Sequence, residues 1–203
     1  MKTQEPTFWT HSKPLILASQ SHIRRAMLES LCLLPLCVPA TIDERKLEES
    51  LEVHELSAAL AKAKALRVAT QFPDHIVLGS DQTLTYNGAN YHKPLNITEA
   101  KTQLQALSGQ THQLKSSAAV VLDGKVLFKT TQNATLTMRV LKPDFIEFYL
   151  ASMGEAVFST VGGYQLEALG LHLFEKIKGD HFTILGFPLL PVLRFLRQTG
   201  YVQ

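Results

Sequence analysis

The sequence predicts an α/β fold built on one mixed sheet, because strand-like and helix-like segments alternate near its start and a β-hairpin follows in its middle. The apolar run at residues 15–18 is typical of a buried strand, and residues 24–33 then carry apolar side chains at helical spacing. Asp123-Gly124 is the strongest short hairpin signal in the chain. With 203 residues, 45% of them apolar, the chain can bury a core without disulfides or a structural metal.

The first part of the chain is predicted as a strand followed by two helices. Ser21 is the expected N-cap of the helix over residues 24–33. Asp43-Glu44 is expected in a polar loop. Ser57 is expected to open a second helix, over residues 58–70, where Ala, Leu and Lys predominate.

The middle of the chain is predicted to contain two hairpins. Residues 76–81 form a strand that ends on a carboxylate, and Asn87-Gly88 makes the first turn. Thr98 is expected to cap a helix that Ser108-Gly109 closes. Residues 116–122 and 126–128 then flank the Asp123-Gly124 turn as the second hairpin.

The last part is predicted as helix, strand, turn and helix. Pro143 suits a helix start, residues 144–152 follow it, and Gly154 closes the helix. Residues 173–177 form a strand before the Gly179-Asp180 turn. A C-terminal helix follows Pro188 and stops at Gly200.

Composition excludes several classes of protein. The 20 basic residues nearly balance the 18 acidic ones, so the chain lacks the basic excess that binds a nucleic acid polymer. The longest uncharged runs contain 13 residues, for example residues 30–42 and 181–193, and are too short to span a bilayer, which predicts no membrane association. Residues 1–13 show no apolar secretory core, so we expect a cytoplasmic protein whose two cysteines are reduced.

The first candidate site is the loop after residues 15–18, with Ser19, Ser21 and Arg24. Backbone N–H groups at a helix start, hydroxyls and a guanidinium together suit a phosphate group. A capped helix with surface arginines is the simpler alternative.

The second candidate is a set of carboxylates at element ends, Asp43, Glu44 and Asp81. A carboxylate at the carboxyl end of a buried strand lies where α/β proteins bind ligands. Carboxylate oxygens suit Mg²⁺ or Mn²⁺, and one of them could act as general base toward water. The alternative is that Asp81 caps a turn and that the Asp43-Glu44 pair is solvated.

Lys64 and Lys93 form the third candidate set, although each alone is typical of a solvent-exposed lysine. The eight histidines include no pair at helical i, i+4 spacing, which disfavours a zinc site. Neither a G-x-x-x-x-G-K-[ST] nor a G-x-G-x-x-G motif after a strand is present, so bound phosphates must be held in another way.

The order of short blocks along the chain carries a family resemblance. The blocks are Ala18-Ser19-x-Ser21-x-x-Arg24, Ile42-Asp43-Glu44, Leu60-Ala61-x-x-Lys64-Ala65, Gly79-Ser80-Asp81-Gln82, Lys93-Pro94, Leu107-Ser108-Gly109-x-Thr111-His112, Gly162-Gly163-Tyr164, Glu175-x-Ile177-x-Gly179-Asp180 and Leu185-Gly186-Phe187-Pro188-Leu189. In these blocks the chain resembles the Maf family of nucleoside triphosphate pyrophosphatases, named for septum formation inhibition, from about residue 14 to its end.

The resemblance implies a single Maf-like domain over residues 1–203, with residues 1–13 as a flexible extension. It implies two interwoven lobes with a central cleft, similar to the inosine triphosphate pyrophosphatases. Members hydrolyse a nucleoside triphosphate to the monophosphate and pyrophosphate with a divalent cation, Mg²⁺ or Mn²⁺, and often form homodimers.

The resemblance also assigns roles by position. Asp81 is implied as the proton acceptor and Glu44 as a second acid that binds the metal or water, so both are candidate metal ligands. Ser19, Arg24, Lys64 and Lys93 are implied as substrate contacts on the phosphates.

Three positions depart from the pyrimidine-type members. Ile23 stands where many members have arginine, Gln82 follows the catalytic Asp in place of Thr, and Glu167 replaces Gln. This combination resembles the branch that prefers 7-methyl-GTP, and the chain as a whole resembles an alphaproteobacterial subgroup. A carboxylate at Glu167 could accept hydrogen bonds from guanine N–H groups. His92 also replaces the family's glycine before Lys93-Pro94.

Two other functions remain open at the level of sequence. One is a nucleotide-binding regulator of cell division in which hydrolysis is incidental, and retention of Glu44 and Asp81 favours an enzyme over it. The other is a phosphatase that releases orthophosphate.

Overall fold

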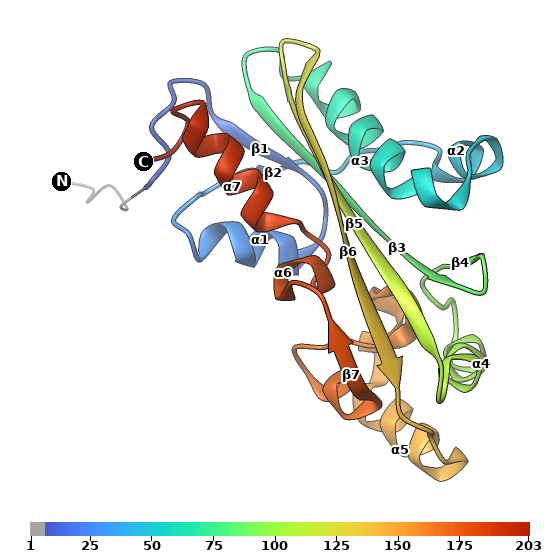
Figure 1. Cartoon of the computed structure of the whole chain (residues 1–203). Helices are drawn as coiled ribbons and strands as arrows, with labels where there is room; N and C mark the ends of the chain where they lie inside the picture. The colour runs from blue at the N-terminus through green and yellow to red at the C-terminus, as the bar shows by residue number, and fades with distance from the viewer. Residues whose placement is uncertain (1–6) are drawn as a thin grey trace. The chain divides into compact units, whose positions relative to one another are not determined.

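The computed structural model describes residues 7–203. In that part of the chain, seven strands form a mixed sheet in the order β2-β1-β3-β5-β6-β7, with β4 paired to β3 (Figure 1). The strands are β1 (Leu15–Ala18), β2 (Leu36–Cys37), β3 (Ile76–Tyr86), β4 (Ala89–Tyr91), β5 (Thr111–Leu122), β6 (Lys125–Met138) and β7 (Phe174–Lys178). β1 pairs in parallel with β2 and β3, whereas β3 with β4 and β6 with β7 are antiparallel. The predicted α/β class with a mixed sheet is confirmed.

The α-helices alternate with these strands along the chain. They are α1 (His22–Glu29), α2 (Glu44–Ser50), α3 (Val53–Ala69), α4 (Ile97–Leu107), α5 (Pro143–Met153), α6 (His181–Ile184) and α7 (Leu189–Gln198). Short 3-10 helices at Gly154–Ser159, Val161–Gly163 and Leu169–Leu173 connect α5 to β7. Among the described residues, no helix has the length and apolarity that a membrane span requires.

The chain divides into two compact units that alternate along the sequence. The first unit comprises the chain up to Asp81, Ser116–Gln132 and Gly186–Gln203; the second comprises Gln82–Lys115 and Asn133–Leu185. The two units do not test whether residues 1–203 form a single domain, which stays a prediction.

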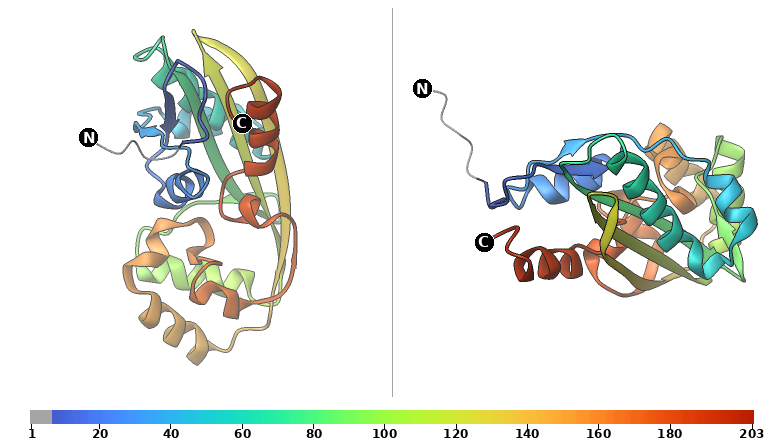
Figure 2. Two further views of the ribbon diagram at one scale, coloured as in Figure 1. Left: turned by 90° about the vertical axis from the view of Figure 1, so that its left-hand side faces the viewer. Right: turned by 90° about the horizontal axis from the view of Figure 1, so that it is seen from above.

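In the first unit, α3 packs against β1, β3 and β5. Ala65, Val68 and Ala69 of α3 share an apolar core with Ile16 of β1 and Val77 of β3. The buried positions of α3 recur three and four residues apart, which gives the helix one packed face. Figure 2 shows α3 running beside the strands.

The segment at residues 7–13 lies beside the C-terminal residues of the same unit. Trp9 forms an antiparallel bridge with Val202, and the Thr10 backbone N–H donates to the Tyr201 carbonyl oxygen at 3.0 Å (Figure 2). The flexible extension predicted over residues 1–13 stays a prediction, and its residues 1–6 lie outside the described part of the chain.

The second unit has its own core. Leu104 and Leu107 of α4, Leu136 of β6 and Tyr149 of α5 are among the buried side chains that cluster there. Apolar contacts among these side chains connect α4 and α5 to β6. The buried residues of both helices recur three and four positions apart, so each helix packs one face into this core.

Both predicted hairpin turns are confirmed. Asn87 and Gly88 have φ angles of 50° and 76°, and Asp123 and Gly124 have 49° and 71°. Two successive residues with positive φ make the tight turn that matches strand twist, and Asn-Gly and Asp-Gly adopt it at the lowest cost. The signal is local, so the sequence alone was sufficient.

Three predicted helix starts or loops are wrong. Ser57 does not open a helix: α3 begins at Val53, and the buried Ser57 hydroxyl hydrogen-bonds Ser117 Oγ at 2.9 Å. Asn96, rather than Thr98, caps α4 by accepting from the Glu99 backbone N–H. Asp43 and Glu44 do not lie in a loop, because Asp43 caps α2 and Glu44 is its first residue.

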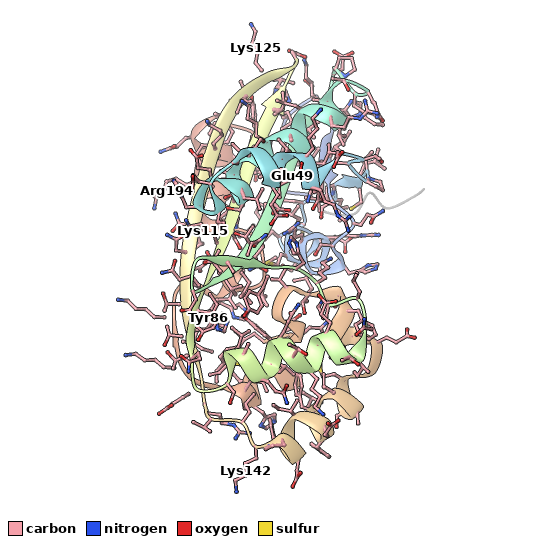
Figure 3. The ribbon with its side chains drawn as sticks, turned by 90° about the vertical axis from the view of Figure 1, so that its right-hand side faces the viewer. Glu49, Tyr86, Lys115, Lys125, Lys142 and Arg194 are labelled. Atoms are coloured by element: carbon pink, nitrogen blue, oxygen red, sulfur yellow. The ribbon has the colours of Figure 1, made fainter. Side chains whose placement is uncertain are left out.

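The strands of the second hairpin are longer than predicted. β5 and β6 contain 12 and 14 residues, because polar residues such as those at 111–115 and 129–133 continue the ladder. Lys125, at the turn between them, and Lys142, before α5, both project away from the ribbon in Figure 3. The labelled basic side chains come from different parts of the chain.

Candidate functional site

The side chain of Lys64 joins two carboxylates in the first unit. Its Nζ lies 2.6 Å from Asp81 Oδ1 and 2.8 Å from Glu44 Oε1. Asp81 belongs to β3, Lys64 to α3, and Glu44 is the first residue of α2. Three elements thus bring together three of the residues that the sequence singled out.

The three side chains differ in burial. The side chains of Asp81 and Lys64 are 10% and 14% exposed, whereas that of Glu44 is 53% exposed. The Asp81–Lys64 pair is therefore largely shielded from solvent, and Glu44 is the member of the group that faces water. Shielding strengthens the attraction within the pair and raises the cost of leaving either charge without a partner.

The environment of Asp81 acts on its pKa in both directions. Burial raises the pKa of the carboxyl, which is the largest effect, while the positive charges of Lys64 and Arg24 lower it and that of the Glu44 carboxylate raises it. The net direction is upward. A buried carboxylate with a raised pKa beside fixed cations is a typical arrangement for a general base.

Backbone contact between α3 and β3 sets the position of Lys64. A Cβ placed on Gly79 would lie 2.2 Å from the Ala61 carbonyl oxygen and 2.7 Å from the Ala65 backbone nitrogen. Only glycine lets the helix approach so closely. Gly79 and Asp81 are two residues apart on β3 and so point to the same face of the strand, toward the helix that carries Lys64.

Arg24 is bonded mainly to the backbone. Its Nε donates to the Gly186 carbonyl oxygen at 2.8 Å, and its Nη1 donates to the Ser80 carbonyl oxygen at 3.0 Å and to Ser19 Oγ at 3.4 Å. Burial lowers the pKa of Arg24, while the charges of Asp81 and Glu44 oppose that effect. The guanidinium therefore fixes the middle of β3, where Asp81 lies, and it contributes positive charge there. β3 continues to Tyr86, so the prediction that this strand ends on Asp81 is wrong.

The loop that begins α1 has the predicted form. Ser21 is the N-cap and accepts from the Arg24 backbone N–H at 3.3 Å, while Ser19 Oγ accepts from the Ser21 backbone N–H at 3.1 Å. Ile23 is the second residue of α1 and is half-buried.

The remaining predicted residues belong to the second unit. Gln82 Nε2 donates to the carbonyl oxygens of Thr183 and Ile184 at 3.1 and 2.9 Å. Lys93 lies between β4 and α4, Glu167 lies between two 3-10 helices, and both are exposed. Their roles, and those of every predicted site residue, stay predictions.

Sequence reasoning missed three backbone carbonyl oxygens that hold predicted site residues. The Gly186 oxygen accepts from Arg24 and also from Ser80 Oγ, at 3.2 Å. The oxygens of Thr183 and Ile184 accept from Gln82. Backbone oxygens leave no residue-type signal in a sequence, so none of the three could have been found there.

The carboxylates of Asp81 and Glu44 offer the oxygen donors that divalent cations prefer. Both carboxylates pair with the Lys64 ammonium, so together they stabilise positive charge at this position. In the described part of the chain no group of three or more His, Cys, Asp or Glu residues is arranged to hold a metal by itself. Two carboxylates with substrate phosphates completing the shell is a common way for proteins to bind Mg²⁺, and the donors present fit it.

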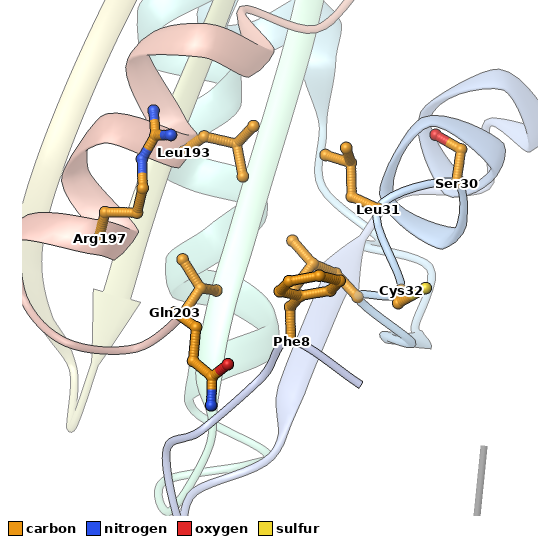
Figure 4. Close-up of a pocket in the computed structure, with 9 residues that line it drawn as sticks. Phe8, Ser30, Leu31, Cys32, Leu193, Arg197 and Gln203 are labelled. Atoms are coloured by element: carbon orange, nitrogen blue, oxygen red, sulfur yellow. The ribbon is translucent and has the colours of Figure 1, made fainter. Parts of the chain in front are cut away.

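A separate cavity in the first unit contains none of the predicted site residues. Its volume is about 240 Å³, and its lining includes Phe8, Leu31, Leu193 and Arg197 (Figure 4). The walls are mostly apolar, without the carboxylate and ammonium groups that lie around Asp81.

Comparison with known proteins gives consistent matches. A family model described as "Maf-like protein" matches residues 14–199. A nucleoside triphosphate pyrophosphatase from Rhodopseudomonas palustris (strain BisB18) is 46% identical over 195 residues, which cover 95% of this chain and 96% of that protein. A 7-methyl-GTP pyrophosphatase from Rhizobium johnstonii is 48% identical over 194 residues, covering 93% of this chain and 98% of that protein.

A solved structure of a HAM1 protein from Coxiella burnetii also matches, at 18% identity and a TM-score of 0.40, over 62% of this chain and 73% of that one. A likeness of this size carries no argument about the present chain.

Proposed function

Since the chain belongs to the Maf family, we propose that it is a nucleoside triphosphate pyrophosphatase, which hydrolyses a triphosphate to the monophosphate and pyrophosphate and so removes modified or non-standard nucleotides. The observation that carries the proposal is the group formed by Glu44, Lys64 and Asp81. It unites a buried base, a fixed cation and a second carboxylate within hydrogen-bonding distance.

Asp81 acts as the general base in this proposal. Its carboxylate accepts a proton from the attacking water, whose oxygen bonds to the α-phosphorus as the bond to the bridging oxygen of pyrophosphate breaks. Lys64 keeps the base ionised, because its charge lowers a pKa that burial raises. Ser80 and Arg24 hold the middle of β3, which fixes the direction from which the base acts.

Positive charge on the substrate side comes from Arg24 and Lys64, and by the family resemblance from Lys93. These groups stabilise the charge that builds up on the departing pyrophosphate. A divalent cation, Mg²⁺ or Mn²⁺, bound through Asp81 and Glu44 would neutralise phosphate charge and favour ionisation of the water. Ser19 is proposed as a further phosphate contact.

The base preference is proposed for 7-methyl-GTP. The support is the combination of Ile23, Gln82 and Glu167, together with the relative from Rhizobium johnstonii that carries that substrate in its name. A carboxylate and an amide oxygen can accept from the adjacent N1–H and N2–H₂ donors of guanine, a pair of donors that a pyrimidine does not present.

The test is a panel of canonical and modified triphosphates with Mg²⁺ or Mn²⁺, in which pyrophosphate and orthophosphate are measured separately. We expect pyrophosphate and a monophosphate, and a loss of about 100-fold or more in Asp81→Asn, because the base is removed. Asp74→Asn is the matched control, since the Asp74 side chain is 86% exposed. Orthophosphate as the product would indicate a phosphatase, and tight binding with negligible turnover would indicate the regulator of cell division.

A further inference from the structure

The side-chain amide of Gln82 has one defined orientation. Its Nε2 donates to two backbone carbonyls, those of Thr183 at 3.1 Å and Ile184 at 2.9 Å. An amide nitrogen carries two hydrogens, and here both are used. The reversed orientation would place the amide oxygen against two carbonyl oxygens, so Oε1 must point away from α6.

The two carbonyls that orient Gln82 belong to a single turn of helix. α6 contains only four residues, His181–Ile184, which is far too short to be stable by itself. Its geometry therefore depends on bonds to neighbouring groups.

Asp180 supplies those bonds. Its Oδ2 accepts from the Thr183 backbone N–H at 2.8 Å and from Thr183 Oγ1 at 2.9 Å, and its carbonyl accepts from the Ile184 N–H at 3.1 Å. Thr183 is fully buried, so its backbone has no access to water as a substitute partner. One carboxylate thus fixes the residue whose carbonyl oxygen receives Gln82.

We infer that Asp180 is a positioning residue for substrate selection: it holds the α6 turn, whose carbonyls hold the Gln82 amide in the orientation that reads the base. The inference rests on the proposed function, in which Gln82 contributes to the choice of base. Asp180 acts through Gln82 in this inference and not on the reacting atoms, so its effect should appear in selectivity.

The experiment compares the ratio of kcat/KM for 7-methyl-GTP to kcat/KM for UTP in four proteins. These are the wild type, Asp180→Ala, Gln82→Ala and the double variant. We expect Asp180→Ala to lower this ratio about 3- to 10-fold, so that it approaches one. A fold-change of this size matches the typical free-energy cost of losing a helix cap. Once Gln82 is absent, removing Asp180 should change the ratio no further, because the two residues act through one path.

Two variants separate positioning from stability alone. Asp180→Asn retains an acceptor oxygen at the cap and should restore most of the wild-type ratio. Thr183→Val removes only the hydroxyl bond and should give a smaller change in the same direction, which keeps the inference testable if Asp180→Ala fails to fold. Asn96→Ala is the matched control, since Asn96 caps α4 in the same unit and its loss should leave the ratio unchanged.

The outcomes distinguish the inference from the function on which it rests. A wild type that releases pyrophosphate while Asp180→Ala and Thr183→Val keep its base ratio would overturn the inference alone. Equal and additive changes from Asp180→Ala and Gln82→Ala would overturn it as well. A wild type that releases no pyrophosphate from any triphosphate would contradict the proposed function itself.

Discussion

Gly79 of β3 and Ala61 of α3 meet at backbone distance, because a Cβ on Gly79 would lie only 2.2 Å from the Ala61 carbonyl oxygen. That approach brings the helix down on the strand two residues before Asp81. The ammonium of Lys64, one helical turn after Ala61, then reaches the Asp81 carboxylate at 2.6 Å. The catalytic pair of the proposed enzyme therefore depends on a residue that has no side chain.

Gly79→Ala should both destabilise the fold and reduce activity. The clash is with backbone, which cannot rotate away, so α3 must shift from β3 at a cost of about 1–3 kcal/mol. The midpoint of thermal unfolding should fall by roughly 3–10 °C, which differential scanning calorimetry measures. Gly88→Ala is the comparison: nothing lies within 4 Å of the Cβ it would add, so its cost comes only from a φ of 76°, and it should lower stability without reducing kcat/KM. Equal losses of activity in the two variants would contradict the close-contact explanation.

Lys64→Met should impair catalysis and move its pH dependence. Lys64 lowers the pKa of Asp81 against the effect of burial, so the pKa rises when the ammonium is removed. The acidic limb of the kcat/KM profile should move to higher pH, and activity at pH 7 should fall about 100-fold. Lys62→Met on the same helix is the control, because Lys62 is exposed. An unshifted acidic limb in Lys64→Met would remove Lys64 from this role.

Asp81→Asn should lack activity, and its stability relative to the wild type should depend on pH. The folded-state pKa of Asp81 is raised, so ionising this group costs folding free energy as pH rises above the unfolded value of about 4. The amide avoids that cost but leaves the largely buried Lys64 ammonium paired with Glu44 alone. The unfolding midpoint of the variant relative to the wild type should therefore rise between pH 4 and pH 7, which calorimetry across this range measures. A difference that stays the same at both pH values would contradict the raised pKa.

The parts of the fold that depend on neighbouring residues were predictable from sequence. The Asn87-Gly88 and Asp123-Gly124 turns need two positive φ angles, which those residue pairs supply locally. The Ser21 cap is equally local. The start of α3 was not predictable, because Ser57 hydrogen-bonds Ser117, 60 residues away, and is buried by packing rather than placed at a helix end.

The candidate site was predictable in its residue types and only partly in its geometry. Carboxylates and scattered lysines could be read from the sequence, and the family blocks ordered them, but Asp81 lies within β3 and not at the predicted strand end. The bridging position of Lys64 between Glu44 and Asp81 depends on how α2, α3 and β3 pack. Arg24 donates to the backbone carbonyls of Ser80 and Gly186. Every residue has a backbone carbonyl, so the residue types in the sequence do not indicate these bonds.

The buried pair of His112 and Tyr164 should make stability fall on the acid side. His112 is 1% exposed, its Nε2 lies 2.7 Å from the Tyr164 hydroxyl oxygen, and burial lowers its pKa to about 4. In the unfolded chain His112 binds a proton below about pH 6.5, whereas in the folded chain it binds one only near pH 4. The unfolded state therefore binds more protons between these pH values, and the free energy of unfolding decreases as pH falls through that interval. The slope attributable to this group is at most about 1.4 kcal/mol per pH unit.

Replacing His112 by Gln should flatten this part of the stability profile, because an amide does not titrate. Urea denaturation of the wild type and His112→Gln at pH 7, 6 and 5 measures the difference, and the gap between their free energies of unfolding should narrow as pH falls. His172→Gln is the matched control, since that histidine is exposed and its substitution should leave the pH dependence in place. A wild-type profile that stays flat from pH 7 to 5 would show that His112 gains a proton in the folded state as readily as in the unfolded one.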